Sequence, residues 1–269
     1  MVLPRPRTSD GAAALGAIAA RPSAALLAFD FDGTLAPIVP DPRDARPHPR
    51  ALAALRALAP RVAGVAVVTG RPAETAVEYG GLDGVPGIVV LGHYGLERWE
   101  DGGLTGPGAV PGLEEARAAL PELLADLGPL GEGVHVEEKG KAVAVHTRRA
   151  ARPAEALDAL REPLRLLAER AGLAVEPGRM VIELRPPGMD KGAALTALAD
   201  RVRPGAVLYA GDDLGDLPAF AAVRDLRTQG VPGVTVCSGS SEAPALAEQA
   251  DLVVDGPEGV AGLLEGLLP

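Results

Sequence analysis

Six short aliphatic runs recur along this chain, and helix-like segments separate most of them. Each run is about one strand long and apolar throughout, as expected of a strand buried on both faces of a parallel sheet. Their alternation with helical segments predicts an α/β fold, a Rossmann-like parallel sheet covered by helices on both faces. The runs are Ala24–Phe29, Val65–Val68, Ile88–Leu91, Val207–Ala210, Val234–Cys237 and Leu252–Val254, and the helical segments include Pro49–Leu58, Lys191–Val202, Glu242–Gln249 and Glu258–Leu268.

The pattern changes between about Glu97 and Arg185, where helix, paired strands, helix and paired strands follow one another. Compact turns at Lys139–Lys141 and Pro177–Arg179 favour two hairpins. Gly/Pro-rich stretches flank this region at 101–112 and 186–188. We therefore expect an α+β domain at 99–185, inserted into a core formed by 1–98 and 186–269. The elements expected in the insert are Leu113–Leu127, Gly133–Glu137, Ala142–Thr147, Ala154–Ala171, Leu173–Val175 and Met180–Leu184.

Two carboxylates, Asp30 and Asp32, follow the first apolar run and precede the glycine turn at Gly33. Residues i and i+2 of an extended chain point the same way, so both side chains leave the carboxyl end of a strand together. Ligands in open α/β sheets bind at that edge. Two like charges so close require a cation or a shared proton, and Mg²⁺ is the hard cation that carboxylates prefer.

Three other segments also follow a predicted strand or begin a helix, so the topology places them at the same edge. Thr69, Gly70 and Arg71 offer a hydroxyl and backbone N–H groups to phosphate oxygens. Lys191 lies in the first turn of a helix, and the stretch 211–216 is a carboxylate-rich turn suited to a divalent cation. Singly, each has a structural alternative: Thr69 as a helix cap, Lys191 as a solvated surface lysine, the acidic turn as a loop without metal.

The order Asp-x-Asp-Gly-Thr, Thr-Gly-Arg, Lys-Gly and Gly-Asp-Asp resembles the haloacid dehalogenase-like superfamily of phosphatases. The resemblance implies that Asp30 is the nucleophile that forms an aspartyl-phosphate and that Asp32 is the general acid and base. It implies that Mg²⁺ is held by Asp30, Asp32 through its carbonyl, and Asp212, while Lys191 and Thr69 neutralise the phosphoryl group. It also suggests that Asp213 and Asp216 lie on the metal side of the site.

Several longer segments are similar to the trehalose-6-phosphate phosphatase family, from about Ala24 onward. They are Val136–Arg148, Leu91–Glu97, Glu183–Pro186 and Gly211–Leu214. In that family the inserted domain is a cap that contacts the sugar, which implies sugar-binding roles for Glu137 and Lys139, and also for His93 and Glu97. Tyr94 stands beside His93 in the same segment, which departs from the family's Gly-Asn-His-Gly pattern.

Two further departures concern the acidic turn. Gly215 and Leu217 stand where the family has threonine and glutamate, although neither position belongs to the phosphoryl-transfer set. Alternatives also remain open for the sugar residues, because His93 can be an ordinary loop histidine and Glu137 a solvated hairpin residue.

The formal net charge of −10 argues against nucleic acid or an anionic membrane as the main partner, since both require a basic surface. The single cysteine, Cys237, cannot form an intrachain disulfide, which favours a reducing compartment, so we expect a cytoplasmic chain. The N-terminal stretch Gly11–Ala20 suits a surface helix better than a signal peptide or membrane span. We also expect a monomer.

The family resemblance implies Mg²⁺-dependent hydrolysis of trehalose 6-phosphate to trehalose and phosphate, in trehalose biosynthesis. One alternative is a phosphatase of the same architecture that acts on another sugar phosphate, such as sucrose phosphate or mannosyl phosphoglycerate. A second is a non-catalytic sugar-phosphate-binding partner of a trehalose phosphate synthase. The retention of Asp30, Asp32, Lys191 and Asp212 argues against the second alternative.

Overall fold

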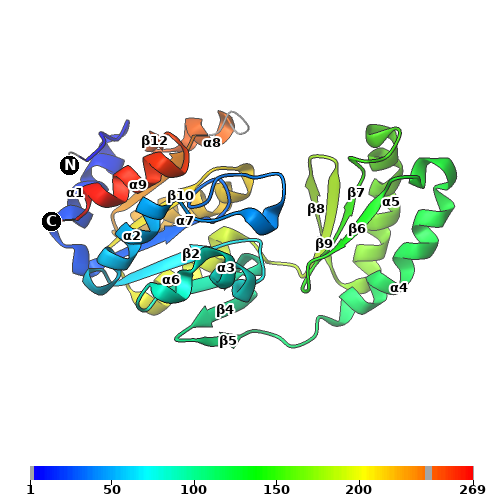
Figure 1. The fold of residues 1–269 in the computed structure, drawn as a ribbon, viewed down its shortest axis with the longest axis horizontal. Coiled ribbons are helices and arrows are strands. Elements are labelled where there is room, and N and C mark those ends of the chain that lie inside the picture. Colours follow the sequence, from blue (N-terminus) through cyan, green and yellow to red (C-terminus); the bar gives the residue numbers. More distant parts are fainter. Residues whose placement is uncertain (1–2, 240–243, 269) are drawn as a thin grey trace. The chain divides into compact units, whose positions relative to one another are not determined.

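The computed structural model of this chain describes residues 3–239 and 244–268. The chain divides into two compact units (Figure 1). Met1–Gly106 and Asp190–Pro269 form the core unit, and Pro107–Met189 form the inserted unit.

A sheet of eight strands forms the centre of the core unit, in the order β12-β11-β10-β1-β2-β3-β4-β5. The strands from β12 to β3 pair in parallel, and β4 and β5 add an antiparallel end. The predicted parallel α/β sheet is thus confirmed. The bounds are β1 Ala25–Phe29, β2 Gly64–Val68, β3 Val89–Gly92, β4 Glu97–Glu100, β5 Gly103–Thr105, β10 Ala206–Gly211, β11 Gly233–Ser238 and β12 Leu252–Val254.

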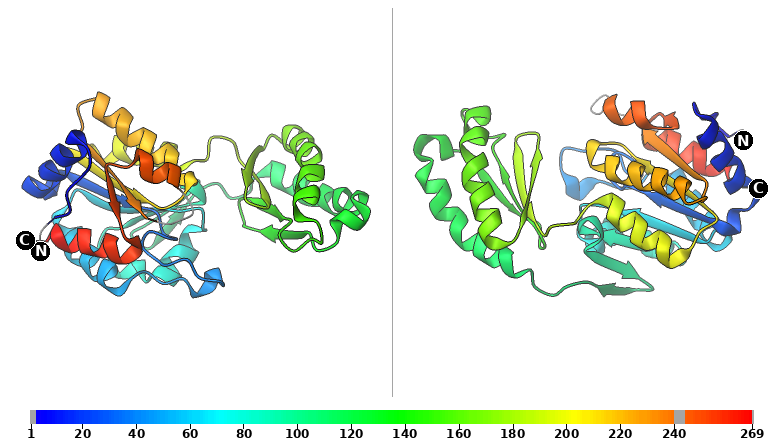
Figure 2. Two further views of the ribbon diagram at one scale, coloured as in Figure 1. Left: turned by 90° about the horizontal axis from the view of Figure 1, so that it is seen from above. Right: turned by 180° about the vertical axis from the view of Figure 1, so that it is seen from behind.

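Helices cover both faces of this sheet (Figure 1; Figure 2). Successive residues of β1 alternate between the faces: Leu27 and Phe29 join one hydrophobic cluster, and Leu26 and Ala28 join the other. The first cluster contains α1 Ser9–Ala20, α2 Pro49–Leu58, α3 Ala73–Gly80 and α9 Gly256–Gly266, and the second contains α6 Lys191–Val202, α7 Leu217–Thr228 and α8 Pro244–Gln249. The predicted start of α8 at Glu242 lies outside the described residues.

The N-terminal helix lies at the surface of the core unit, as predicted, with one face packed on the sheet. Thr8 caps α1 by accepting a hydrogen bond from the Gly11 N–H. Ala14, Leu15 and Ile18 are buried against the sheet, so the helix is part of the core. In the part of the chain that the structure describes, no helix is both long and apolar enough to span a membrane.

Because β4 and β5 belong to the large sheet, the inserted unit begins later in the chain than the sequence predicted. The expected insert began at residue 99, but β4 pairs with β3, so Trp99 lies opposite Val90 in the large sheet. The turn to β5 is Asp101-Gly102, whose φ angles of 52° and 78° are both positive. Such a pair is the preferred two-residue hairpin turn. The first boundary therefore falls after Gly106 and the second after Met189.

The inserted unit has its own antiparallel sheet, in the order β6-β7-β9-β8. Val143, Val145, Ile182 and Leu184 pack with the two helices in one hydrophobic cluster. The second hairpin turn is Arg179-Met180 rather than the predicted Pro177–Arg179, because Pro177 and Gly178 still pair with β9. The bounds are α4 Pro111–Asp126, β6 His135–Glu138, β7 Val143–His146, α5 Pro153–Ala171, β8 Ala174–Gly178 and β9 Val181–Arg185.

Candidate active site

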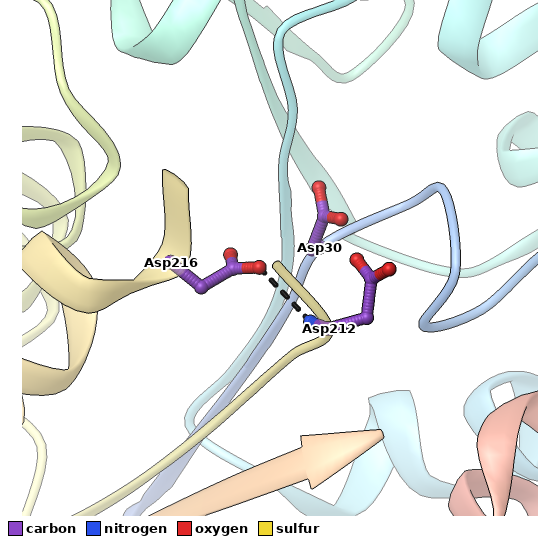
Figure 3. A group of neighbouring side chains, drawn as sticks. All are labelled: Asp30, Asp212 and Asp216. Atoms are coloured by element: carbon purple, nitrogen blue, oxygen red, sulfur yellow. Dashed lines mark hydrogen bonds between the residues drawn. The ribbon is translucent and has the colours of Figure 1, made fainter. Parts of the chain in front are cut away.

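The carboxyl ends of β1 and β10 bring three buried acids together. The Asp30 N–H donates to the Ala210 carbonyl at 2.8 Å, which continues the parallel pairing one residue beyond β1. Asp30, Asp212 and Asp216 each have a carboxylate oxygen within 4.8 Å of the others. Figure 3 shows the three side chains converging from β1 and from the turn after β10.

Lys191 provides the positive charge in this cluster. Its Nζ lies 2.8 Å from Asp30 Oδ1 and 2.8 Å from Asp216 Oδ1, and its side chain is only 5% exposed. Burial alone would lower the pKa of Lys191, but Asp216 and Asp30 outweigh that effect and raise it well above its usual value. The ammonium group therefore stays charged and is aimed at Asp30.

Asp216 has no free carboxylate oxygen. Oδ1 accepts hydrogen bonds from Lys191 Nζ and the Tyr209 hydroxyl, and Oδ2 accepts from the N–H groups of Asp212 and Asp213. Gly211 makes room for this carboxylate, because a Cβ there would lie 2.2 Å from its Cγ. Asp216 thus fixes both Lys191 and the turn that carries Asp212.

Asp212 lies against the turn that follows β1. A Cβ on Gly33 would meet Asp212 Oδ2 at 2.0 Å, and Gly33 has a φ of +72°, which favours glycine. The Asp212 carboxylate thus occupies the space that a side chain at position 33 would take. Burial and the neighbouring Asp213 and Asp216 raise the pKa of Asp212 to about 7.

The arrangement of these acids fits a hard divalent cation. Burial, together with Asp216 and Asp212, raises the pKa of Asp30 well above its usual value despite its contact with Lys191. Such crowding of carboxylates is relieved by a cation with oxygen ligands. Both oxygens of Asp216 already accept two hydrogen bonds each, so within this cluster Asp30 and Asp212 are the carboxylates that could hold the ion.

The other two predicted metal ligands, Asp32 and Asp213, contribute no side chain to this cluster of described acids. Asp213 instead caps a short 3₁₀ helix, Leu214–Asp216, by accepting from the Gly215 N–H at 2.9 Å. Asp32 is paired with Arg71: Nε donates to Oδ2 and Nη2 donates to Oδ1, both at 2.7 Å. The role predicted for the Asp32 carbonyl is independent of that side-chain contact.

Arg71 was predicted to offer its backbone N–H to a phosphate, and in the structure this N–H donates to the Thr69 hydroxyl while the guanidinium lies on Asp32. Its third nitrogen, Nη1, donates to the Pro42 carbonyl at 2.8 Å. The guanidinium also lies 5.2 Å from the centre of the Phe31 ring, a cation–π contact. The planar guanidinium of Arg71 lies on Asp32 because its parallel N–H groups match the two oxygens of a carboxylate.

Thr69 and Gly70 follow β2 at the same sheet edge. Thr69 is buried, and its hydroxyl accepts a hydrogen bond from the Arg71 N–H at 3.1 Å. The adjacent segment supports the loop, because the Tyr94 N–H donates to the Thr69 carbonyl. A Cβ at Gly70 would lie 2.7 Å from the Tyr94 hydroxyl, so this position has no room for a side chain.

His93 and Glu97, predicted to contact sugar, are both buried in the core unit. Glu97 Oε2 accepts from the Ala73 N–H at 3.1 Å, where a carboxylate stabilises the first turn of α3. The His93 N–H donates to the Arg71 carbonyl at 2.9 Å. The structure thus gives both residues contacts that shape the Thr69–Arg71 loop.

Glu137 lies in β6 and Lys139 in the turn that follows it. The neighbouring Val136 packs on the hydrophobic cluster, so alternation along β6 places Glu137 on the other face of the inserted sheet. Glu137 Oε2 lies 2.8 Å from His146 Nε2, and Lys139 Nζ donates to Glu183 Oε2 at 2.7 Å. Sequence reasoning missed His146 as a partner of Glu137. Alternation along β7 places His146 opposite to Val145, on the charged face.

Comparison with known proteins identifies the family. The family model described as trehalose-phosphatase matches residues 28–255. The chain belongs to the trehalose-phosphatase family. Trehalose-phosphate phosphatase of Mycobacterium avium (strain 104) is 42% identical over 217 residues, which are 76% of this chain and 52% of the relative. The chain thus spans about half the length of that protein.

Solved structures confirm the predicted fold class of this trehalose-phosphatase family member. A trehalose-6-phosphate phosphatase of Aspergillus fumigatus superposes with a TM-score of 0.72 at 25% identity and covers 98% of each chain. A haloacid dehalogenase-like hydrolase from Bacteroides thetaiotaomicron superposes with a TM-score of 0.65, covering 90% of this chain and 99% of its own. At 17% identity the second likeness concerns the fold alone.

Proposed function

We propose that this chain hydrolyses trehalose 6-phosphate to trehalose and inorganic phosphate, with Mg²⁺ as its cofactor. The observation that supports the proposal most is the buried Asp30–Lys191 pair beside Asp212, in a chain of the trehalose-phosphatase family. It places a carboxylate nucleophile next to a fixed cation for the phosphoryl group.

In the first step a carboxylate oxygen of Asp30 bonds to phosphorus, and the bond from phosphorus to the sugar oxygen breaks. Asp32 donates a proton to the departing sugar oxygen from one of its two carboxyl oxygens, which must first leave the contact with Arg71. In the second step Asp32 takes a proton from water, the water oxygen bonds to phosphorus, and the bond to Asp30 breaks. Trehalose leaves after the first step and phosphate after the second.

The other site residues of the core unit bind the phosphoryl group, orient Asp32 or hold the metal ion during these steps. Lys191, Thr69 and the Gly70 N–H bind the phosphoryl oxygens, and Arg71 keeps Asp32 oriented. Asp30, Asp212 and the Asp32 carbonyl would hold Mg²⁺. When bound, the ion neutralises phosphoryl charge that repels an incoming carboxylate.

For the sugar, we assign Glu137 and Lys139 to hydroxyl groups of the disaccharide. Charged side chains make strong hydrogen bonds to hydroxyls once water is excluded, and a site built for them rejects substrates that lack them. His93 and Glu97 would contribute by shaping the phosphate loop. We further propose that the chain is a cytoplasmic monomer, and a trehalose phosphate synthase is the partner that would supply its substrate.

A substrate panel tests the proposal. Purified protein with Mg²⁺ is assayed for phosphate release from trehalose 6-phosphate, sucrose 6-phosphate, mannosyl phosphoglycerate and p-nitrophenyl phosphate. We expect kcat/KM for trehalose 6-phosphate to exceed the others by about a hundredfold, and chelation by EDTA to abolish turnover until Mg²⁺ is restored. Asp30→Asn is the inactive control and should retain the wild-type melting temperature within a few degrees, by the usual range for single substitutions (roughly ±4 °C).

The outcomes separate the alternatives. Comparable turnover of the unrelated phosphates would favour a phosphatase with another or a broad specificity. A protein that binds trehalose 6-phosphate but releases no phosphate would be the non-catalytic sugar-phosphate partner. Near-normal activity of Asp30→Asn would contradict the covalent mechanism.

A further inference from the structure

Tyr209 is a buried polar side chain that the mechanism above does not use. It lies in β10 with no exposed surface, in a strand whose other residues are aliphatic or glycine. Its hydroxyl donates a hydrogen bond of 2.7 Å to Asp216 Oδ1. A tyrosine in such a core position normally needs a partner for its hydroxyl, and here the partner is an active-site carboxylate.

The same oxygen of Asp216 also binds the catalytic lysine. Lys191 Nζ lies 2.8 Å from that atom and 2.8 Å from Asp30 Oδ1. Two of the three ammonium N–H groups are therefore used by carboxylates, and the third is left for a phosphoryl oxygen. The direction of that third N–H depends on where Asp216 Oδ1 lies.

The tyrosine ring is itself held in place. Phe220 of α7 contacts it edge to face, with the ring centres 6.2 Å apart and the planes at 82°. Gly211 lies two residues further along β10, and its lack of a side chain leaves room for the Asp216 carboxylate. The packed ring thus donates from its hydroxyl to Oδ1, while two backbone N–H groups donate to Oδ2.

From this geometry we infer that Tyr209 is a positioning residue for phosphoryl transfer, which acts by fixing Asp216 and so aims Lys191 at Asp30 and the phosphoryl group. The inference deepens the proposed function and rests on it for the chemistry. Without the hydroxyl, Lys191 is the one hydrogen-bond donor to Oδ1 that remains among the described residues, and the ammonium group is drawn toward Asp216 at the expense of the phosphoryl oxygen.

The test compares Tyr209→Phe with Thr235→Val. Phenylalanine keeps the ring and removes only the hydroxyl. Thr235 lies opposite Tyr209 in the neighbouring strand, and its hydroxyl donates at 2.9 Å to a different buried carboxylate, Asp251, which is not in contact with Lys191. Both variants lose a buried hydroxyl-to-carboxylate hydrogen bond, but only the first loses one that reaches the lysine.

Three quantities are measured on the full chain with Mg²⁺: kcat and KM for trehalose 6-phosphate, the affinity for orthovanadate by calorimetry, and the melting temperature. For Tyr209→Phe we expect kcat and orthovanadate affinity each to fall about tenfold, a typical loss for one hydrogen bond to a charged group, with KM little changed. For Thr235→Val we expect a lower melting temperature with kcat and orthovanadate affinity unchanged.

Equal losses of kcat and orthovanadate affinity in both variants would overturn the inference, because Tyr209 would then serve stability alone. So would wild-type kcat and affinity in Tyr209→Phe. If wild-type protein binds orthovanadate but hydrolyses no phosphate ester, the proposed function fails while the affinity ratio of the two variants still decides the role of Tyr209. Absence of orthovanadate binding in wild-type protein would contradict both.

Discussion

Arg71 forms a bidentate ion pair with Asp32, in which Nε donates to Oδ2 and Nη2 donates to Oδ1, each at 2.7 Å. The two residues are 39 positions apart in the chain and come from the loops that follow β1 and β2. The Asp32 side chain is 41% exposed and the Arg71 side chain 13% exposed. A partly solvated acid and base is thus oriented by a more deeply buried arginine.

Replacing Arg71 by lysine should lower kcat by about tenfold or more, because a single ammonium cannot reproduce the two-point contact that orients Asp32. The measurement is steady-state turnover of trehalose 6-phosphate together with thermal unfolding. Arg43→Ala is a suitable control, since Arg43 pairs with Asp41 in an exposed loop nearby and should have wild-type kcat. Equal kcat for Arg71→Lys and wild type would show that turnover does not need the two-point contact between Arg71 and Asp32.

Gly33→Ala should weaken cation binding. The added Cβ would lie 2.0 Å from Asp212 Oδ2 and the residue would keep a φ of +72°, so Asp212 must move away from Asp30. We expect a smaller rise in melting temperature on addition of Mg²⁺ than in wild type, and a lower kcat. Gly87→Ala has a similar φ of +64° with open space around it, so it reports the backbone strain alone. A Mg²⁺ effect that is the same in all three proteins would contradict this account of Gly33.

Glu137→Ala should raise KM for trehalose 6-phosphate by about tenfold while sparing p-nitrophenyl phosphate, because the lost contact is to the sugar and not to the phosphoryl group. The matched control is Glu138→Ala. Glu138 is the next residue of β6 and its carboxylate binds Arg117 at 2.8 Å, so its loss should leave both substrates unaffected. A parallel loss of activity on both substrates in Glu137→Ala would argue against a sugar contact.

Asp251→Asn should destabilise the core unit, by about 3 kcal/mol. Asp251 is buried and accepts hydrogen bonds from Thr8, Thr235 and Arg227, which join the start of α1 to β11 and α7. Burial alone would raise the pKa of Asp251, but these hydrogen bonds outweigh it and lower the pKa.

The sign of the pH dependence follows from that lowered pKa. The stabilisation by Asp251 is complete above the pKa of an unfolded aspartate, about 3.9, and is lost as the pH falls through the lower pKa of the folded state. Urea unfolding of both proteins across pH 2.5 to 7 (a range of roughly four units that brackets this pKa) should show a difference that is constant above about pH 5 and shrinks below pH 4. A difference that is independent of pH would contradict the assignment of the effect to the ionised carboxylate.

Much of the core was predictable because its signals are local. The strands β1, β2, β3, β10, β11 and β12 lie within a residue or two of the aliphatic runs that predicted them, since a strand buried on both faces needs no partner information to be recognised. The hairpin β4–β5 was missed despite the Asp101-Gly102 turn, because Glu97–Glu100 lacks an aliphatic run. The charged residues of β4 instead form ion pairs within the core unit, because Glu100 pairs with both Arg98 and Arg201.

In the candidate site, likewise, the sequence predicted residues that have a local signal but not their partners in space. Asp30, Asp32, Thr69, Lys191 and Asp212 were predicted as site residues from the sequence because each follows a recognisable strand or begins a helix. The partners of these residues were not, because a hydrogen bond between residues far apart in the chain leaves no local pattern. Tyr209 left one faint signal, a polar tip in a buried aliphatic strand, but nothing in the sequence indicates that it points at Asp216.

By itself, then, the sequence determined the six parallel strands of the large sheet, the edge at which the acids gather and the family that the motifs resemble, since these depend on short-range periodicity and spacing. The tertiary structure alone decided which partner each charged side chain has. Lys191 lies between Asp30 and Asp216, and Arg71 pairs with Asp32. Glu97 accepts a hydrogen bond from the first turn of α3, and Asp212 occupies the space beside Gly33. The physical reason is that buried charges are stable only when paired and hydrogen-bonded, and which partner lies within about 3 Å is fixed by the packing of the whole core.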